Sequence, residues 1–236
     1  NLFLSLFTPK LDILYEDEDV VLVNKPKGMV VHPAAGHYSG TLVNGLMYHC
    51  KDQLSGINGV MRPGIVHRID MDTTGVLAVC KNDASHNCLA AQLKEHSITR
   101  VYFAVAHGVI KENSGTVRAP IGRHPTDRKR MSIHSKSGRD AVTHFEVLER
   151  FRHFTYVKCR LETGRTHQIR VHMSSLGCPL AGDWLYGVED RTLIARPALH
   201  AGRLELTHPV TGKPLTFAAP LPKDMIIVLE RFVCPS

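Results

Sequence analysis

Apolar and polar positions follow the period of a β-strand in several parts of the chain. Residues 11–26 indicate two short strands around an acidic turn, ended by Pro26. A continuous apolar run within residues 75–82 predicts a central strand, and residues 99–108 predict another. Two segments within residues 198–220 predict a closing pair of strands. The alternation across residues 154–162 places four side chains on one strand face: Thr155, Val157, Cys159 and Leu161.

Helical spacing of apolar residues predicts helices in other segments. One covers residues 41–50 with Thr41 as its N-cap, and another covers residues 84–96 with Asp83 as its cap. Residues 222–232 predict a terminal helix. Strands outnumber helices and are mostly joined by short turns, so we expect a mixed, largely antiparallel α+β fold. The chain shows no repeat, low-complexity tract or linker, which favours a single domain over residues 1–236.

A further helix is expected within residues 164–177, which also hold a cluster of basic side chains. Thr166 is the candidate N-cap and Gly177 the stop signal. The apolar stripe of this helix consists of Ile169, Met173 and Leu176. The basic side chains are Arg165, His167, Arg170 and His172. An arginine beside a helix N-terminus suits a phosphate or a carboxylate, although a solvated basic face fits equally well.

Composition and charge favour a polyanionic partner. The chain has 29 Lys and Arg residues against 22 Asp and Glu residues, which gives a net charge of +7, and 15 His residues. Such a surplus is typical of nucleic-acid-binding proteins, although a mildly basic protein without that partner also fits. Residues 123–139 concentrate eight basic side chains among Pro, Ser and Gly, which predicts a flexible loop that contacts a phosphate backbone. The eight are Arg123, His124, Arg128, Lys129, Arg130, His134, Lys136 and Arg139.

Several classes of protein are disfavoured by what the sequence lacks. No apolar run approaches the ~20 residues that span a bilayer, and residues 1–11 lack the basic leader of a signal peptide. The six cysteines form no CxxC pair and no zinc spacing, which indicates free thiols in a reducing cytoplasm. The histidines at 167 and 172 are five apart, so no helical zinc pair is expected. Phosphate-binding, dinucleotide-binding and nucleophile-elbow signatures are also missing.

A cluster of ionisable residues stands just before the predicted central strand. It consists of His67, Arg68, Asp70 and Asp72. Charged groups beside a buried strand need partners, and a carboxylate held in a partly dry cleft can act as an acid, a base or a nucleophile. Asp72 also fits a role in bracing the turn, and Asp70 also fits a structural ion pair.

Together these segments resemble the RluA family of RNA pseudouridine synthases, and within it the RluD-type branch that modifies large-subunit ribosomal RNA. Residues 24–36, NKPKGMVVHPAAG, resemble the first motif of the family, and residues 64–82 resemble the motif that carries the catalytic aspartate. Residues 99–108 match the tyrosine element and residues 161–173 match the arginine motif. The resemblance implies a mostly antiparallel bent sheet, flanked by helices and loops, with a central RNA cleft.

The same resemblance implies roles for individual residues. Asp70 corresponds to the catalytic aspartate, Tyr102 to the active-site tyrosine and Arg165 to the arginine that pairs with the aspartate. Arg68 is expected to fill the gap left by the flipped nucleotide, and Ile169 to line the pocket. The remaining residues expected to contact RNA are His67, Arg128, Lys129 and Arg130.

Two positions depart from the family pattern. Ile69 replaces the usual Leu conservatively, and Met71 stands where a Lys or Arg is common, which removes one cation near the site. Many RluD-type relatives also carry an N-terminal S4 RNA-binding domain. That domain is not visible in this chain, and we expect the sequence to be a truncated form.

The chemistry of pseudouridine formation agrees with the missing signatures. The reaction breaks the N1–C1′ bond of uridine and joins C5 to C1′, with no net redox change, so we expect no cofactor and no metal. Asp70 could add to the sugar or base, or remove a proton from C2′, and Tyr102 could stack under the base and take the C5 proton. Two other interpretations remain open: a non-catalytic RNA-binding or ribosome-assembly factor, and a hydrolase that uses Asp70 with Asp72. We expect a cytoplasmic monomer that acts on structured RNA, most plausibly ribosomal, although transfer RNA also fits.

Overall fold

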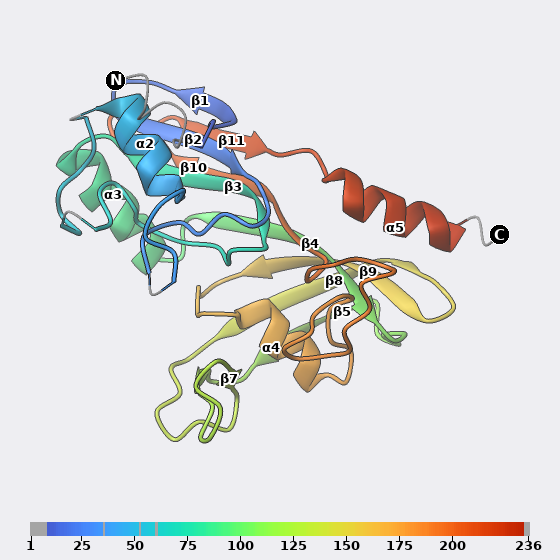
Figure 1. The fold of residues 1–236 in the computed structure, drawn as a ribbon. Coiled ribbons are helices and arrows are strands. Elements are labelled where there is room, and N and C mark those ends of the chain that lie inside the picture. The colour runs from blue at the N-terminus through green and yellow to red at the C-terminus, as the bar shows by residue number, and fades with distance from the viewer. Residues whose placement is uncertain (1–8, 35, 52, 60, 234–236) are drawn as a thin grey trace. The chain divides into compact units, whose positions relative to one another are not determined.

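The computed structural model describes residues 9–34, 36–51, 53–59 and 61–233 (Figure 1). The chain divides into two compact units: the first comprises residues up to Ile98 together with Arg203–Ala219, and the second comprises Thr99–Gly202 and the residues from Pro220 onward. The expectation of one domain therefore stays a prediction. The predictions for residues 1–8 and for Cys234 fall on residues that the structure does not describe.

The first unit is built on antiparallel strands. Its elements are β1 (Ile13–Glu16), β2 (Val20–Lys25), α2 (Leu42–Cys50), β3 (Thr74–Cys80), α3 (Asp83–Lys94), most of β10 (Leu199–Thr207) and β11 (Pro214–Ala218). β2 pairs antiparallel with β1 and β3, and β10 pairs antiparallel with β11. Every residue of β3 is buried, which confirms the central strand that its apolar run predicts. Leu22, Val76 and Leu204 join one core cluster with Leu89 of α3.

The helices of the first unit begin at side-chain caps. Thr41 caps α2 as predicted, because its hydroxyl oxygen accepts from Asn44 N while the Asn44 side chain accepts from Thr41 N. The prediction that Asp83 caps α3 is wrong. Asn82 is extended and its side chain accepts from Ser85 N at 2.8 Å, so Asp83 becomes the first helical residue.

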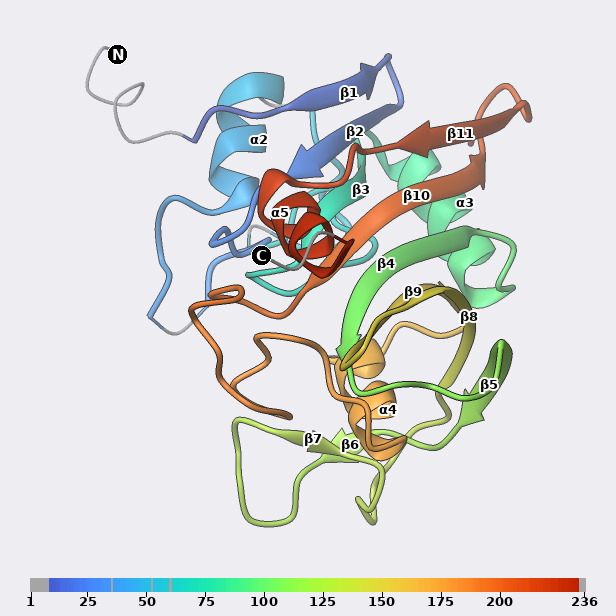
Figure 2. The ribbon, with the colours of Figure 1, turned by 90° about the vertical axis from the view of Figure 1, so that its right-hand side faces the viewer.

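The second unit contains a four-stranded antiparallel sheet in the order β4-β9-β8-β5. Its elements are β4 (Thr99–His107), β5 (Ser114–Arg118), β6 (Gly122–Arg123), β7 (Met131–Ser132), β8 (Val142–Arg150), β9 (Phe154–Leu161), α4 (Gln168–Ser175) and α5 (Lys223–Val233). β4, β9 and β8 curve around α4 (Figure 2). The α+β class and the mostly antiparallel pairing are thus confirmed. Thr155, Val157, Cys159 and Leu161 are all buried, as their alternation predicts.

Three predictions about the second unit need correction. α4 begins after His167, not Thr166: His167 occupies the N-cap position with a left-handed backbone (φ 56°) and makes no side-chain cap. Leu176 follows the last helical turn and is 44% exposed, so it does not extend the buried stripe of Ile169 and Met173. The basic segment 123–139 is not one irregular loop, because β6 and β7 pair antiparallel within it.

Burial also explains the cysteines that the structure describes. Five of them are free thiols, and those of Cys50, Cys80 and Cys159 are buried. Burial raises the pKa of Cys80 and of Cys159 to about 12. These thiols therefore behave as small apolar core groups.

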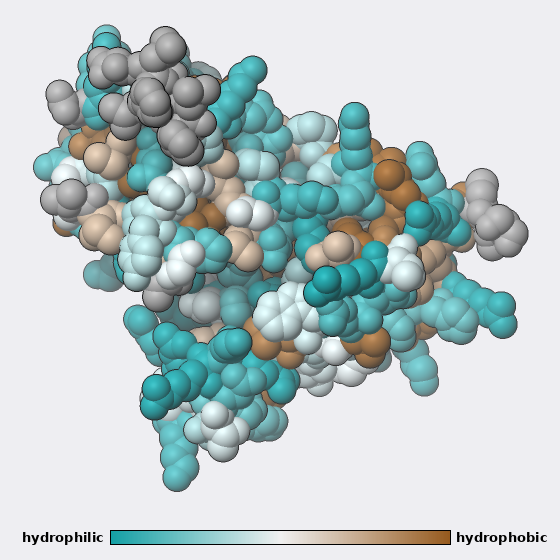
Figure 3. Space-filling view, viewed as in Figure 1, coloured by the Kyte–Doolittle hydropathy of each residue, from teal (hydrophilic) through white to brown (hydrophobic). Residues whose placement is uncertain are grey.

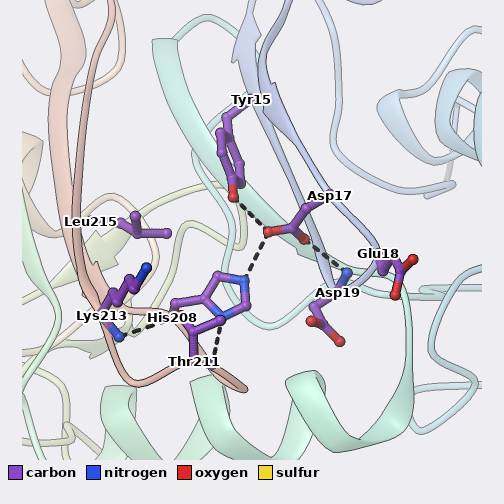
Figure 4. A pocket seen from close by; sticks show the side chains of 8 residues that line it. All are labelled: Tyr15, Asp17, Glu18, Asp19, His208, Thr211, Lys213 and Leu215. Carbon is purple, nitrogen blue, oxygen red and sulfur yellow. Dashed lines mark hydrogen bonds and ion pairs between the residues drawn. The ribbon is translucent and has the colours of Figure 1, made fainter.

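A polar pocket in the first unit joins the β1–β2 turn to the β10–β11 turn (Figure 4). One oxygen of Asp17 accepts from Tyr15 OH at 2.6 Å and from His208 Nε2 at 2.8 Å, and the other accepts from Asp19 N and Val20 N. His208 Nδ1 accepts from the backbone of the following turn, which leaves the proton on Nε2. The carboxylate is thus fully satisfied.

Burial alone would raise the pKa of Asp17, but the hydrogen bonds from Tyr15, Val20, Asp19 and His208 hold it at about 2, below its ordinary value of 3.8. A carboxyl group with a lowered pKa stabilises the fold above its unfolded-state pKa and loses that contribution as the pH falls. The contribution is ~2 kcal/mol. It is complete above about pH 4 and disappears toward pH 2.

We expect Asp17→Asn to lower the free energy of unfolding by ~2 kcal/mol at pH 7, because an amide offers one acceptor where the carboxylate offers two. Urea unfolding at several pH values checks this, and the difference from the parent should shrink between pH 4 and pH 2. Glu18→Gln, an exposed change in the same turn, serves as the control. Equal stability of the parent and Asp17→Asn at pH 7 would contradict the assignment.

Candidate active site

Asp70 lies in a tight turn of the first unit that leads directly into β3. Thr73 N donates to Asp70 O at 3.1 Å and closes the turn, and β3 starts at the next residue. Ile69 is buried, Asp70 is half-buried and Arg68 is exposed. The apolar side chain of Ile69 therefore anchors the turn, while its charged neighbours Arg68 and Asp70 are more accessible to solvent.

The segment before this turn is fixed against β3. His67 Nε2 accepts from Ala78 N at 3.0 Å, so the ring is tied to the middle of the strand. Gly64 has a φ of +72°, and a Cβ there would lie 2.5 Å from Cys80 O, so only glycine fits this close approach. The geometry shows a bracing role for His67, and its contact with RNA stays a prediction.

Lys25 is bonded to the turn that contains Asp70, and sequence analysis did not single this lysine out. Its side chain is only 1% exposed, and Nζ donates to three carbonyl oxygens at 2.8 Å each: those of Pro26, Met29 and Met71. Met71 is the residue that follows Asp70. The available signal for Lys25 was its place at the end of a strand whose preceding residues are mostly buried. An ammonium group buried there needs hydrogen-bond partners such as these carbonyl oxygens.

Tyr102 lies in the second unit on β4, opposite Cys159 of β9, and is only 7% exposed. Arg100, two residues earlier, is also buried and donates to Glu162 O at 3.0 Å. Burial lowers the pKa of Arg100, the nearby Tyr102 opposes this shift, and the charge of Arg165 adds to it. A Cβ at Gly164 would meet the Arg100 guanidinium at 2.6 Å, so the glycine leaves room for this cation.

Gln168 fixes the turn that carries Arg165. Its side-chain oxygen accepts from Arg165 N at 2.9 Å and from Thr163 Oγ1 at 2.8 Å. Its side-chain nitrogen donates to Val142 O and to Thr143 Oγ1 at 3.0 Å each. Gln168 is only 3% exposed, so these four bonds meet its full hydrogen-bonding capacity inside the protein.

The side chain of Arg165 is oriented by the loop beside it. Its Nε donates to Asp140 O at 2.9 Å. Burial and the charge of Arg139 lower the pKa of Arg165, while the carboxylate of Asp140 opposes the shift. Arg139 is therefore near enough to Arg165 for its positive charge to act on it.

The basic segment forms a hairpin with an ordered turn, and this hairpin carries Arg128, Lys129 and Arg130. Asp127 Oδ1 accepts from Lys129 N at 2.9 Å, and Arg130 N donates to Asp127 O. His124 N donates to Arg130 O at 3.1 Å across the hairpin. The side chains near β7 form a hydrophilic surface (Figure 3). Cations on such a hairpin can contact phosphates.

The structure distributes the predicted residues over both units. The first unit brings His67, Arg68 and Asp70 together on one segment. The second unit contains the other predicted residues: Tyr102, Arg128, Lys129, Arg130, Arg165 and Ile169. Ile169 is buried in α4, and its contact with the base stays a prediction, as does the ion pair of Arg165 with Asp70.

Two groups in the described residues have the spacing of metal ligands, and both are already engaged. Glu16, near His49 and Cys50, binds His49 Nε2 at 2.7 Å and Lys81 Nζ at 3.0 Å. The other group is Asp17, Asp19 and His208, where Asp17 and His208 bind each other. Neither group contains a predicted catalytic residue.

Comparison with known proteins decides the family. Residues 19–175 match the model of RNA pseudouridylate synthase, and this span contains Asp70, Tyr102 and Arg165. The chain belongs to the RNA pseudouridylate synthase family. The resemblance seen in the sequence is thereby confirmed, and the chain is an RNA pseudouridine synthase of the RluA family.

Individual synthases are similar along most of the chain. "Uncharacterized RNA pseudouridine synthase YlyB" of Bacillus subtilis (strain 168) is 60% identical over 221 residues, which cover 94% of this chain and 72% of that protein. "Ribosomal large subunit pseudouridine synthase D" of Pseudomonas aeruginosa is 49% identical, with coverage of 94% and 71%. The solved structure of human RNA pseudouridylate synthase domain containing 1 has a TM-score of 0.70 at 29% identity, with coverage of 89% and 83%.

We expect Lys25→Met to lower the free energy of unfolding by ~3 kcal/mol, because it removes the buried charged donor of three carbonyl groups. In this synthase it should also reduce turnover by about tenfold or more, because the turn that carries Asp70 loosens. Urea unfolding and a turnover assay measure the two effects. Lys10→Met, which changes an exposed lysine of the same unit, is the control. Parent-like activity in Lys25→Met would show that the ammonium does not position Asp70.

Proposed function

We propose that this synthase isomerises specific uridines of structured large-subunit ribosomal RNA without a cofactor. The observation that carries the proposal is the carboxylate of Asp70, held on a braced turn of the first unit. Similarity to proteins named large-subunit synthases supports the ribosomal substrate. The reaction moves one glycosidic bond from N1 to C5, so it requires neither an oxidant nor an energy source.

The RNA must first present its target base. A base in folded RNA leaves its stack at a cost of a few kcal/mol, about the value that phosphate contacts and an inserted side chain can offset. Arg68 is exposed two residues before Asp70 and is suited to occupy the gap that the base leaves. Arg128, Lys129 and Arg130 are placed on an ordered hairpin and supply cations for the phosphates.

Asp70 then acts on the flipped nucleotide, with Arg165 keeping its carboxylate ionised. The carboxylate adds to the sugar or base, or removes the proton from C2′, and the N1–C1′ bond breaks. After the base has turned and C5 has joined C1′, Tyr102 takes the proton that C5 loses.

The setting of the enzyme follows from its substrate. A ribosomal RNA target supports our proposal of a cytoplasmic enzyme. One chain contains all the proposed groups, which supports a monomer. In the described residues, no helix has the length and apolar character needed to cross a bilayer.

Asp70→Asn should abolish turnover, a loss of ~10³-fold or more, because the amide neither attacks nor takes a proton. Tritium release from C5-labelled uridine in a large-subunit transcript measures the reaction. The variant should still bind the transcript, which a filter-binding assay checks. Turnover close to the parent value would remove Asp70 from the mechanism, and Asp72→Ala, which should stay active, separates the synthase from a carboxylate-pair hydrolase.

Tyr102→Phe should bind RNA like the parent yet release little tritium, since only the hydroxyl group that accepts the C5 proton is lost. The buried ring is kept, so the melting temperature should stay within a few degrees of the parent value. If this variant releases tritium at the full rate, Tyr102 is not the base for that step.

A further inference from the structure

Trp184 is an exposed aromatic residue outside the proposed catalytic groups. It is the only tryptophan of the chain and its exposed fraction is 53%. An isolated exposed apolar residue is ordinary in a soluble protein, so exposure alone indicates nothing. The surroundings of Trp184 decide whether the indole is a binding group.

The turn that carries Trp184 is rigidly held from inside. Asp183 Oδ1 accepts from Leu185 N at 3.1 Å and from Tyr186 N at 3.2 Å, and Gly187 N donates to Asp183 O at 2.9 Å. The Asp183 carboxylate is fully buried and receives two bonds from Arg170, at 2.7 and 2.8 Å. Trp184 is therefore presented to solvent from a fixed backbone, which lowers the entropy lost when a partner binds it.

The same turn contacts the basic hairpin. Tyr186 OH accepts from Met131 N of β7 at 2.8 Å, and the Arg130 guanidinium lies 5.5 Å from the centre of the Tyr186 ring. Leu185 packs with Met131 against one core cluster that includes Tyr186. Trp184 directly precedes Leu185. The indole therefore lies on the same turn that supports the basic hairpin, whose cations are proposed to contact phosphates.

We propose that Trp184 is a stacking platform for an unpaired base of the RNA segment that contacts the basic hairpin. The proposal rests on the RNA substrate proposed above and adds a contact outside the catalytic groups. A flat aromatic side chain beside basic residues suits single-stranded RNA, because the cations follow the backbone while a base stacks on the ring. Such stacking contributes ~1–3 kcal/mol per base, which corresponds to about 5- to 150-fold in affinity.

The single tryptophan makes the test direct, because all indole emission comes from position 184. Titration of the parent with a single-stranded RNA taken from a large-subunit transcript should quench this emission saturably. Trp184→Ala should weaken binding of the labelled RNA by at least about fivefold in fluorescence anisotropy, and Trp184→Phe should keep most of the affinity. Val188→Ala, which changes an exposed aliphatic residue of the same segment, should bind like the parent.

The outcomes separate this inference from the proposed function. If the parent binds RNA and forms pseudouridine while its emission stays constant and Trp184→Ala binds equally well, the stacking platform is wrong. Emission that changes with protein concentration alone would assign Trp184 to self-association and would also overturn it. If the parent neither binds the RNA nor forms pseudouridine in any large-subunit transcript, the proposed substrate itself fails.

Discussion

The ammonium group of Lys25 is the buried charge around which the turn that contains Asp70 is organised. Removing an ammonium from water is costly, and three carbonyl oxygens at hydrogen-bond distance replace its lost hydration. Two of these oxygens follow β2 closely in sequence, but the third belongs to Met71, 46 residues away. The charge therefore couples the end of one strand to the entry of another, and it fixes the backbone beside Asp70. A carboxylate that must act on one atom of a nucleotide benefits from such a rigid support.

The second unit applies the same principle with neutral groups. Gln168 satisfies both of its side-chain ends inside the protein and thereby fixes the turn of Arg165. His167, the residue before Gln168, has a left-handed backbone conformation. Its Nδ1 is hydrogen-bonded to Tyr186 OH at 2.8 Å. Such strained, fully bonded turns are common at functional sites, since the surrounding structure holds them in place. Short turns thus carry the predicted residues Asp70 and Arg165, whereas the predicted residue Tyr102 lies on strand β4.

Much of this arrangement could be predicted from the sequence, because local patterns determine the elements. The apolar run of β3, the alternation of β9 and the capping box of α2 are each decided within a few residues. The strands β5 and β8 gave weaker patterns, since several of their residues remain exposed, and they were not predicted. The cap of α3 was misplaced because Asn82 and Asp83 are neighbours and both residue types are good caps. The start of α4 was misplaced because His167, which makes no side-chain cap, takes the N-cap position after the good candidate Thr166.

The supporting residues of the site were harder to predict for a different reason. Lys25, Arg100 and Gln168 acquire their importance from partners far along the chain, namely Met71, Glu162 and Val142. Sequence spacing does not reveal contacts between residues so far apart. A lysine or a glutamine, taken by its residue type alone, is expected to be exposed. The predicted catalytic residues Asp70, Tyr102 and Arg165 could be named only through the family resemblance. A turn with two carboxylates is by itself compatible with several kinds of chemistry.

Conversion of uridine to pseudouridine in large-subunit ribosomal RNA can be measured at every position of the RNA. Unmodified large-subunit RNA is incubated with the protein, and pseudouridine is mapped by carbodiimide modification and reverse transcription. We expect stops at a few discrete uridines, which are absent when the RNA is incubated without the protein. If no new stop appears, on free RNA and on ribosomal particles alike, the chain does not catalyse this conversion in large-subunit RNA.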